Sequence, residues 1–305
     1  MFEGVSGDHP KLTDPYESSA SRFRSLLKSN AMNTAHSRFW ILLGLVTTAC
    51  LFNGCISILN QHSARGAKSY QWAMPSQASV LYVDIPNGNI LVDRSSQDSA
   101  VQAVAAFEVH ARSAALAQEV LQEIQLVVEE RPDGLAVSVR SPISSASDSV
   151  DLTLNVPAGI PVDLEVANGS IRVLSTQPTV EARTRNGRIE VDNHGGQVQL
   201  VTSNGQIVLR GAPAEFTCQS SNGAIDIFLH GPWAGNGTVR TSNGRISVEG
   251  DAEINAYVAA EAGNGKVQMQ NVLADTELNQ PRMLQLHSQN GGIRVVAARP
   301  PQVSP

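Results

Sequence analysis

Apolar and polar residues alternate along much of this chain in short runs that repeat in one register. Each run is broken by an Asn-Gly pair, and an isoleucine or valine follows two residues after the glycine. The eight pairs are Asn87-Gly88, Asn168-Gly169, Asn186-Gly187, Asn204-Gly205, Asn222-Gly223, Asn243-Gly244, Asn264-Gly265 and Asn290-Gly291. From Asn168 to Asn222 they recur every 18 residues, and the later intervals are 21, 21 and 26. A period near twenty residues, with longer units tolerated, is typical of stacked repeats.

The apolar residues of the repeats fall into four columns counted from each asparagine. Positions three and five after the asparagine are apolar in every repeat, and positions four and six before it are apolar except at Gly237. This alternation predicts strands with one buried side and one solvent-facing side. The parity of the apolar positions changes across the Asn-Gly pair, so one extra residue turns the chain around a corner there. We expect the glycine to supply the positive φ of that corner.

Two architectures are compatible with these strands. Asn-Gly between alternating runs is a strong hairpin signal, which favours a sandwich of ordinary β-hairpins. The flanking strands, however, share the same columns in every unit, so each strand can pair with its copy one coil away. The pattern therefore favours a mainly β fold, a single-chain β-solenoid over residues 158–297, in which the corner asparagines could stack into a side-chain ladder.

All the variation in coil length lies at the second corner, between the end of one unit and the start of the next. Insertions in solenoids collect on one face, which is often the binding face. Trp233 and Tyr257 lie in the lengthened corners, and we predict that they form an interaction edge for an envelope protein or a glycan. Two alternatives stay open: a loop that merely tolerates insertion, or a Trp233 that folds back over the coil near Gly237.

The segment before the solenoid is different in kind. Residues 79–157 contain one repeat unit, a strand at 101–111, a helix with Ser113 as its N-cap, and strands at 135–140 and 150–156. We predict a small α+β cap there, because a bare terminal coil exposes an aggregation-prone edge. Residues 55–78 are interpreted as a tether. Residues 298–305 form a tail in which Arg299-Pro300-Pro301 is expected to close the far end of the stack.

An apolar run at residues 39–52 follows Arg38 and ends shortly before Gly54-Cys55. This arrangement resembles the lipobox of bacterial lipoproteins, so residues 32–54 are predicted to be a lipoprotein signal peptide with Cys55 as the lipidated residue. Met32 then starts a signal of normal length, and residues 1–31 are an N-terminal extension from a start-site misassignment. The alternative is an uncleaved membrane helix at 39–59. Both place the rest of the chain on the outer side of the cytoplasmic membrane, facing the periplasm or the cell surface.

Composition and candidate chemistry narrow the function classes. From Cys55 onward the chain has 17 Lys and Arg against 24 Asp and Glu, which disfavours nucleic acid as a partner. Cys218 occupies an apolar column and is expected to be a core residue. His194, His230 and His287 fall at different offsets in the repeat, so we expect no metal site, and we expect no cofactor. Glu190 and Asp226 are interpreted as isolated, solvated carboxylates, so no enzymatic activity is predicted.

Taken together, the signal, the strand-helix-strand opening and the coils of Asn-Gly-x-Ile-x-Val type resemble a known group over residues 79–297. That group is the β-strand-repeat bacterial envelope proteins of unknown function catalogued as putative adhesins. The resemblance implies a β-solenoid in the cell envelope and transfers no catalytic residues. Three functions stay open: a non-enzymatic envelope lipoprotein for adhesion or envelope interaction, a self-assembling scaffold similar to the bactofilins, and a carbohydrate-active β-helix enzyme.

Overall fold

The computed structural model describes residues 62–74, 80–94, 100–143, 147–174, 177–274 and 282–299, together with a two-residue strand, β1 (Thr48–Ala49). Cys55, residues 1–31 and the rest of the expected signal segment lie outside the described residues. Among the residues that are described, no helix is both long and apolar enough to cross a bilayer.

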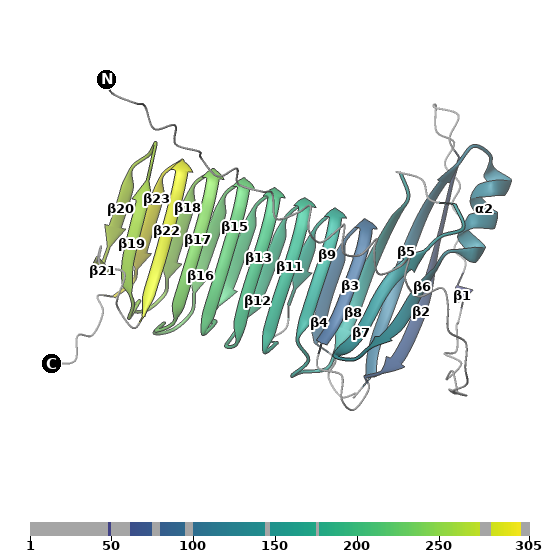
Figure 1. Ribbon diagram of the computed structural model, residues 1–305, viewed down its shortest axis with the longest axis horizontal. Helices are drawn as coiled ribbons and strands as arrows, with labels where there is room; N and C mark the ends of the chain where they lie inside the picture. Colours follow the sequence, from purple (N-terminus) through teal and green to yellow (C-terminus); the bar gives the residue numbers. More distant parts are fainter. Residues whose placement is uncertain are drawn as a thin grey trace, which may run out of the picture. The chain divides into compact units, whose positions relative to one another are not determined.

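Two facing β-sheets form the solenoid (Figure 1). One sheet, sheet B, contains in spatial order β3 (Val80–Asn87), β9 (Val162–Asn168), β11 (Thr179–Asn186), β13 (Gln197–Asn204), β15 (Glu215–Asn222), β17 (Asn236–Asn243), β22 (Met283–Asn290), β19 (Tyr257–Ala262) and β21 (Leu273–Ala274). The other, sheet A, contains β4 (Ile90–Arg94), β10 (Ile171–Val173), β12 (Ile189–Asn193), β14 (Ile207–Gly211), β16 (Ile225–Leu229), β18 (Ile246–Gly250), β23 (Ile293–Ala297) and β20 (Val267–Gln270).

Every strand of these two stacks pairs in parallel with the equivalent strand of the neighbouring coil. Ile171 lies opposite Ile189, and Asn186 lies opposite Asn204, so the register follows the asparagine count. The predicted β-solenoid is therefore confirmed, and the hairpin alternative is wrong. Each strand finds its partner one coil away because the copies present the same columns at the same positions.

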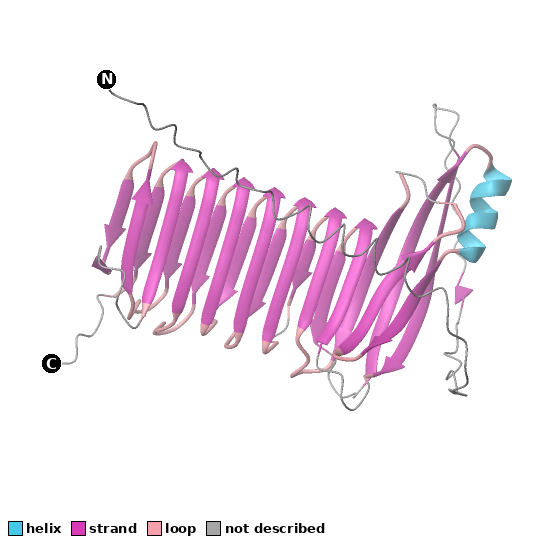
Figure 2. Cartoon of the chain, in the orientation of Figure 1, coloured by secondary structure: helices cyan, strands magenta, loops and turns pink. Residues whose placement is uncertain are grey.

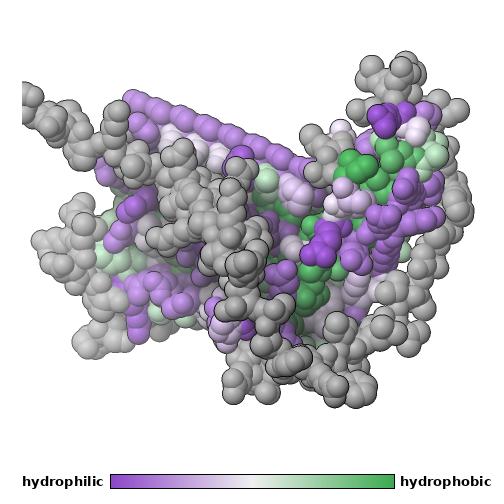
Figure 3. Space-filling model, turned by 45° about the vertical axis from the view of Figure 1, so that its right-hand side comes forward, coloured by the Kyte–Doolittle hydropathy of each residue, from purple (hydrophilic) through white to green (hydrophobic). Residues whose placement is uncertain are grey.

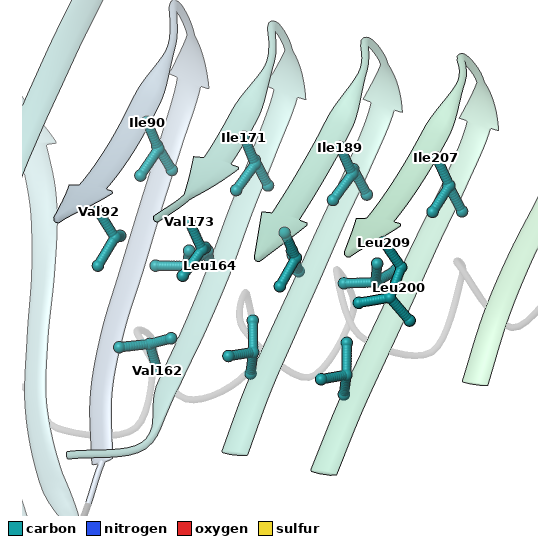
Figure 4. Close-up of a cluster of buried hydrophobic side chains, with 14 of the residues drawn as sticks. Ile90, Val92, Val162, Leu164, Ile171, Val173, Ile189, Leu200, Ile207 and Leu209 are labelled. Atoms are coloured by element: carbon teal, nitrogen blue, oxygen red, sulfur yellow. The ribbon is translucent and has the colours of Figure 1, made fainter. Parts of the chain in front are cut away.

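The core lies between the two sheets and consists of the four predicted columns (Figure 4). Leu164 of β9 and Val173 of β10 are both fully buried, and their side chains point into the same layer. Cys218, which was expected in this core, is fully buried too, and burial raises the pKa of its thiol. Among the described coils, that of β19 and β20 departs from the burial pattern, since Val267 and Met269 are 38% and 39% exposed.

The last unit in the sequence is not the last coil in space. β22 pairs with both β17 and β19, and β23 pairs with both β18 and β20, so the Asn290 unit lies between the Asn243 and Asn264 units. The coil of β19 and β20, and not the C-terminal unit, is therefore the last coil of the stack. Pro300 and Pro301, which were expected to close it, lie outside the described residues. A parallel ladder accepts any strand with the matching register, and the twelve residues between β20 and β22 provide the length for the chain to return to the inner position.

The cap closes the opposite end of the stack (Figure 2). β2 (His62–Ala73) pairs antiparallel with β5 (Ala100–Ala111), which pairs with β8 (Ser149–Val156), while β6 (Gln125–Arg131) pairs with β7 (Gly134–Arg140). Helix α2 (Ala114–Glu123) begins after Ser113, whose Oγ accepts from Leu116 N at 3.3 Å, and the helix packs on β2 and β5. The expected cap therefore contains two strands, β2 and β6, that the periodicity did not predict.

Residues 62–73 form β2 along their whole length, so the tether interpretation is wrong for them. Their inward positions are small or amphipathic rather than apolar, which hides the strand in the sequence. Gly66 faces Leu121 of α2, and a Cβ at Gly66 would lie 3.3 Å from a Leu121 methyl group. Lys68 Nζ donates to the carbonyls of Gln122 and Ile124 at 2.8 and 2.5 Å, which caps the C-terminus of the helix.

Candidate functional site

The Asn-Gly corners carry a continuous ladder of side-chain hydrogen bonds. Except at Asn87, which only accepts within the ladder, the Nδ2 of each asparagine donates to the Oδ1 of the neighbouring asparagine at 2.7–2.9 Å. In spatial order the members are Asn87, Asn168, Asn186, Asn204, Asn222, Asn243, Asn290 and Asn264. Figure 3 shows a continuous hydrophilic row along this edge. The side-chain ladder considered from the sequence is thus present, and its order follows the exchanged last coils.

The corner glycines serve close packing more than backbone conformation. Of the eight, only Gly88 and Gly169 have φ in the left-handed region, at 120° and 150°. A Cβ at Gly205 would instead lie 1.8 Å from the carbonyl oxygen of Gly187 in the adjacent coil, and the other corner glycines meet a backbone oxygen at 1.6–2.2 Å. The expectation that positive φ explains these glycines is therefore wrong for most of them, because stacked backbones leave no room for a side chain.

A second, internal ladder lies two residues before five of the eight asparagines, where the residue is a threonine or a serine. Thr202 Oγ1 donates to Gly187 O at 3.3 Å, and Ser220 Oγ donates to Gly205 O at 3.2 Å. The buried members of this column are Thr184, Thr202, Ser220, Thr241 and Ser288. The sequence analysis did not predict this ladder, although the recurrence of threonine or serine two residues before the asparagine indicates it. With both ladders made, these corners are structural, and their polar groups are already bonded to neighbouring coils.

The second corner does not present Trp233 to solvent. Its side chain is 2% exposed, its Nε1 donates to Pro213 O at 2.8 Å, and its ring centroid lies 5.5 Å from that of Phe216. The prediction of Trp233 as an exposed contact residue is therefore wrong. The alternative, in which Trp233 folds back over the coil near Gly237, fits the structure, because Phe216 fills the space above Gly237 and Trp233 packs on Phe216. Tyr257 is half-buried in β19.

Two of the histidines do meet at this corner, contrary to expectation. The rings of His194 and His230 stack with centroids 5.8 Å apart, although the two residues occupy different offsets in the repeat. His230 Nδ1 lies 3.0 Å from Asp251 Oδ2, and this hydrogen bond holds the pKa of Asp251 below its usual range. His287 lies elsewhere, 3.4 Å from Glu261. Within the described ranges, no group of three or more His, Cys, Asp or Glu side chains is arranged to hold a metal ion.

The outer face of sheet A is a network of ion pairs. Glu190 binds Arg210 at 2.5 Å and has Arg172 and Arg188 within 3.7 Å. Asp226 accepts from Gln206 at 2.5 Å and from Arg245 at 3.0 Å. These carboxylates are therefore bonded to basic or amide groups of neighbouring coils, and the interpretation of both as isolated is wrong.

The outer face of sheet B near the cap carries a carboxylate array that the sequence reasoning missed. Asp84 lies opposite Glu165, and Asp163 lies opposite Glu181, on adjacent strands. Partial burial raises the pKa of Asp84, Asp163 and Glu165, and neighbouring carboxylates raise it further. Arg183 opposes this effect because it bonds Asp163 at 2.7 Å and also bonds Glu181. In the sequence, this array is indicated by acidic residues three and five positions before successive asparagines.

Raised carboxyl pKa values occur both at acid-base sites and in structural ion-pair networks. Here Asp163 and Glu181 are already bonded to Arg183, which is the arrangement of a network. A surface hollow lies elsewhere, on sheet A at the cap, where Arg65 and Glu108 form an ion pair of 2.6 Å on its wall. The array and the hollow are therefore separate features.

The far end of the stack is open. β20 is the terminal strand of sheet A, and all four of its residues are exposed. In sheet B the terminal strand β21 pairs only with Tyr257 and Val258 of β19. Among the described coils, this one alone exposes the two columns that follow the asparagine, at Val267 and Met269, while Val258 of β19 is buried.

No protein-family model matches the chain, and no curated protein matches it. Several crystal structures are similar to it. One is a putative adhesin from Bacteroides fragilis, at 11% identity and a TM-score of 0.39, covering 75% of this chain and 97% of that one. A putative cell adhesion protein from Clostridium sporogenes has 11% identity and a TM-score of 0.33, covering 77% and 100%. A putative lipid binding protein from Parabacteroides distasonis has 12% identity and a TM-score of 0.37, covering 75% and 96%.

The resemblance to proteins named as putative adhesins, expected from the sequence, is thus confirmed among solved structures. At these identities and TM-scores, neither a ligand nor an activity transfers from them to this chain.

Proposed function

We propose that this chain is a non-enzymatic envelope lipoprotein, anchored at its cap end and adhesive at its open end. One observation carries the proposal. The described chain enters the solenoid through β2 in the cap, whereas the coil at the opposite end exposes the inward-facing Val267 and Met269.

The dimensions support this orientation. Cys55 stands seven residues before His62, the first residue of β2, and seven extended residues span about 25 Å. A lipid on Cys55 would therefore hold the cap near the membrane. From Asn87 to Asn264 the ladder makes seven steps. At about 4.8 Å a step, the open end then lies about 34 Å further along the stack.

The two ladders support a role as a rigid frame. At five corners both the asparagine and an inner threonine or serine are bonded to a neighbouring coil, and the hydroxyl donates to the carbonyl oxygen of that coil's corner glycine. Bonds that couple every coil to the next resist bending at any single coil, which suits a spacer that presents one end at a fixed height.

Lipidation is tested first, on the full chain. Wild-type cells are expected to incorporate a fatty-acid label into the protein, and Cys55→Ser is expected to abolish both the label and the cleavage before residue 55. A wild-type product that keeps residues 32–54 and takes up no fatty acid would show that a membrane helix is the anchor instead.

Adhesion is tested by expressing the chain in a bacterial host that lacks it and counting the cells that attach to a lawn of cells expressing the wild-type chain. Met269→Lys places a charge at the open end, and Gln199→Lys places the same charge on an exposed position of β13 in the middle of the stack. Attachment is expected for the wild type and Gln199→Lys and is expected to be lost in Met269→Lys and Cys55→Ser. Equal attachment by the two lysine variants would refute a role for the open end.

A further inference from the structure

The open end is a coil without a neighbour. In every other described coil, the residues three and five after the asparagine are at most 1% exposed. In the terminal coil the same two columns are occupied by Val267 and Met269, which are more than one third exposed. β20 pairs with β23 on one side only, so its other edge carries unpaired backbone groups. This edge therefore offers both backbone hydrogen bonds and two apolar side chains at fixed spacing.

We propose that the open end docks against the open end of a second copy of this chain. In a two-fold arrangement, β20 of each copy lies antiparallel to β20 of the other. Side chains opposite one another in an antiparallel pair point to the same face, so a residue and not a peptide bond must lie on the two-fold axis. We choose Gln268 for this position because both apolar residues of β20 are then paired. Val267 of each copy then lies opposite Met269 of the other, so each exposed apolar residue covers its counterpart.

Charge also favours this partner. The four residues of β20 carry no charge, so their self-pairing brings no like charges together. The carboxylate array lies on β3, β9 and β11, and five ladder steps separate the corner at Asn186 from that at Asn264. Five steps of about 4.8 Å are about 24 Å, so the arrays of two joined copies are separated by several Debye lengths at physiological ionic strength.

The cap limits the assembly to two copies. α2 packs on β2 and β5. The cap edge of sheet A is β1, which pairs antiparallel with β2, and the cap edge of sheet B is β6; neither strand repeats the asparagine register. A filament needs both ends of each stack to accept a neighbour, whereas this chain offers one such end. The bactofilin-like alternative, an extended scaffold, is therefore disfavoured by the same geometry that favours the dimer.

Cross-linking tests the register with the full-length chain in detergent. Gln268→Cys places a thiol on the proposed axis, where it meets its own copy, and Gln199→Cys is the matched exposed control on β13. Under mild oxidation, Gln268→Cys is expected to give a cross-linked dimer, well above the parent chain with its native cysteines. Gln199→Cys is expected to match the parent. Equal cross-linking at both positions, or cross-linking of Gln268→Cys only to other proteins, would overturn the proposal.

Sedimentation equilibrium provides a second readout that does not depend on an added cysteine. The wild type is expected to have about twice the chain mass of 32.4 kDa, apart from detergent and any processing. Met269→Lys places a charge opposite the apolar Val267 of the other copy and sets the two lysines diagonally across the axis, so it is expected to weaken the dimer by about tenfold or more, with an unchanged melting temperature. A wild type that stays monomeric at its highest soluble concentration would refute the dimer.

If the proposed anchoring and adhesion are correct, on which this step rests, the dimer joins two chains on facing membranes. Wild-type cells should then attach to a lawn that expresses the chain and not to a lawn that lacks it. Equal attachment to both lawns would leave adhesion standing and refute self-recognition. A wild-type chain that forms the dimer in detergent, on cells that attach to neither lawn, would instead leave self-recognition standing and refute adhesion.

Discussion

At the scale of single residues, the two members of the Asn-Gly pair make different contacts with the neighbouring coils. The asparagine bonds its copies above and below, and the glycine permits the adjacent backbones to approach. The sequence alone predicted the corner and the side of each flanking strand, because both follow from parity. It could not distinguish a glycine required for φ from one required for space, since that difference depends on the distance to a neighbouring coil.

Gly205→Ala tests this distinction. Its Cβ would lie 1.8 Å from Gly187 O, so the coils must separate, and we expect a loss of about 3 kcal/mol or more in the free energy of unfolding. The control is Gly195→Ala, where φ is 99° but no atom lies within 4 Å of the new Cβ. Left-handed strain alone should cost about 1–2 kcal/mol there. Denaturant unfolding compares the two, and a larger loss at Gly195 would contradict the packing explanation.

The carboxylate array predicts a pH dependence of stability. The pKa of Glu165 is raised by burial first and by Asp84 next, so the folded state binds a proton more readily than the unfolded state. Its unfavourable contribution is complete above the folded pKa and fades as the pH falls through that value toward 4.5. Glu165→Gln should therefore raise the melting temperature at pH 7, and its advantage over the wild type should shrink on acidification.

The matched control for this measurement is Glu249→Gln, which removes the partner that Arg294 bonds at 2.6 Å. This variant should lower the melting temperature slightly at pH 7, because it breaks an exposed ion pair. If Glu165→Gln and Glu249→Gln shift the melting temperature in the same direction, mutual repulsion in the array is not the cause.

At the scale of elements, prediction from sequence succeeded where strands repeat and failed where they do not. The coils share columns, and α2 has a capping serine and one apolar face. β2 is built on Ala64, Gly66, Lys68 and Tyr70 at its inward positions, so it lacks the apolar alternation that identifies a strand. The exposure of Trp233 was mispredicted for a related reason. Trp233 is buried against Phe216 of the preceding coil, and these two residues become neighbours only when the coils stack.

Trp233→Ala tests the role of the lengthened corner. Trp233 packs on Phe216, donates to Pro213 and forms a bridge with Ile254, so its removal leaves a cavity between two corners. We expect a loss of about 3–5 kcal/mol in the free energy of unfolding. The dimer and the attachment of cells should persist below the lowered melting temperature. Unchanged stability with lost attachment would instead restore the interaction-edge hypothesis.

At the scale of the whole molecule, the exchange of the last two coils has a physical reason. Gly237 leaves a gap in the apolar columns of β17, and a Cβ there would lie 2.7 Å from a methyl group of Leu284 in β22. β22 places Leu284 and Leu286 beside Gly237 and Val239, whereas β19 would place Val258 and Ala260 there. Leu284 and Leu286 fill this gap better than Val258 and Ala260 would. The coil of β22 and β23 therefore takes the inner position, and the coil of β19 and β20 becomes the open end.

Two variants with equal numbers of coils test this reason. Deletion of residues 254–279 removes β19 to β21 and leaves six residues between β18 and β22, as many as join β16 to β17. Truncation after residue 274 removes β22 and β23 instead, so β19 and β20 must pack on β17 and β18 and leave the space beside Gly237 unfilled.

We expect the truncated chain to be less stable by about 2–3 kcal/mol, the cost of replacing leucines by smaller residues in a core. Denaturant unfolding at one protein concentration measures the difference. Equal stabilities would mean that the order of the last coils is set by the length of their connections and not by the packing around Gly237.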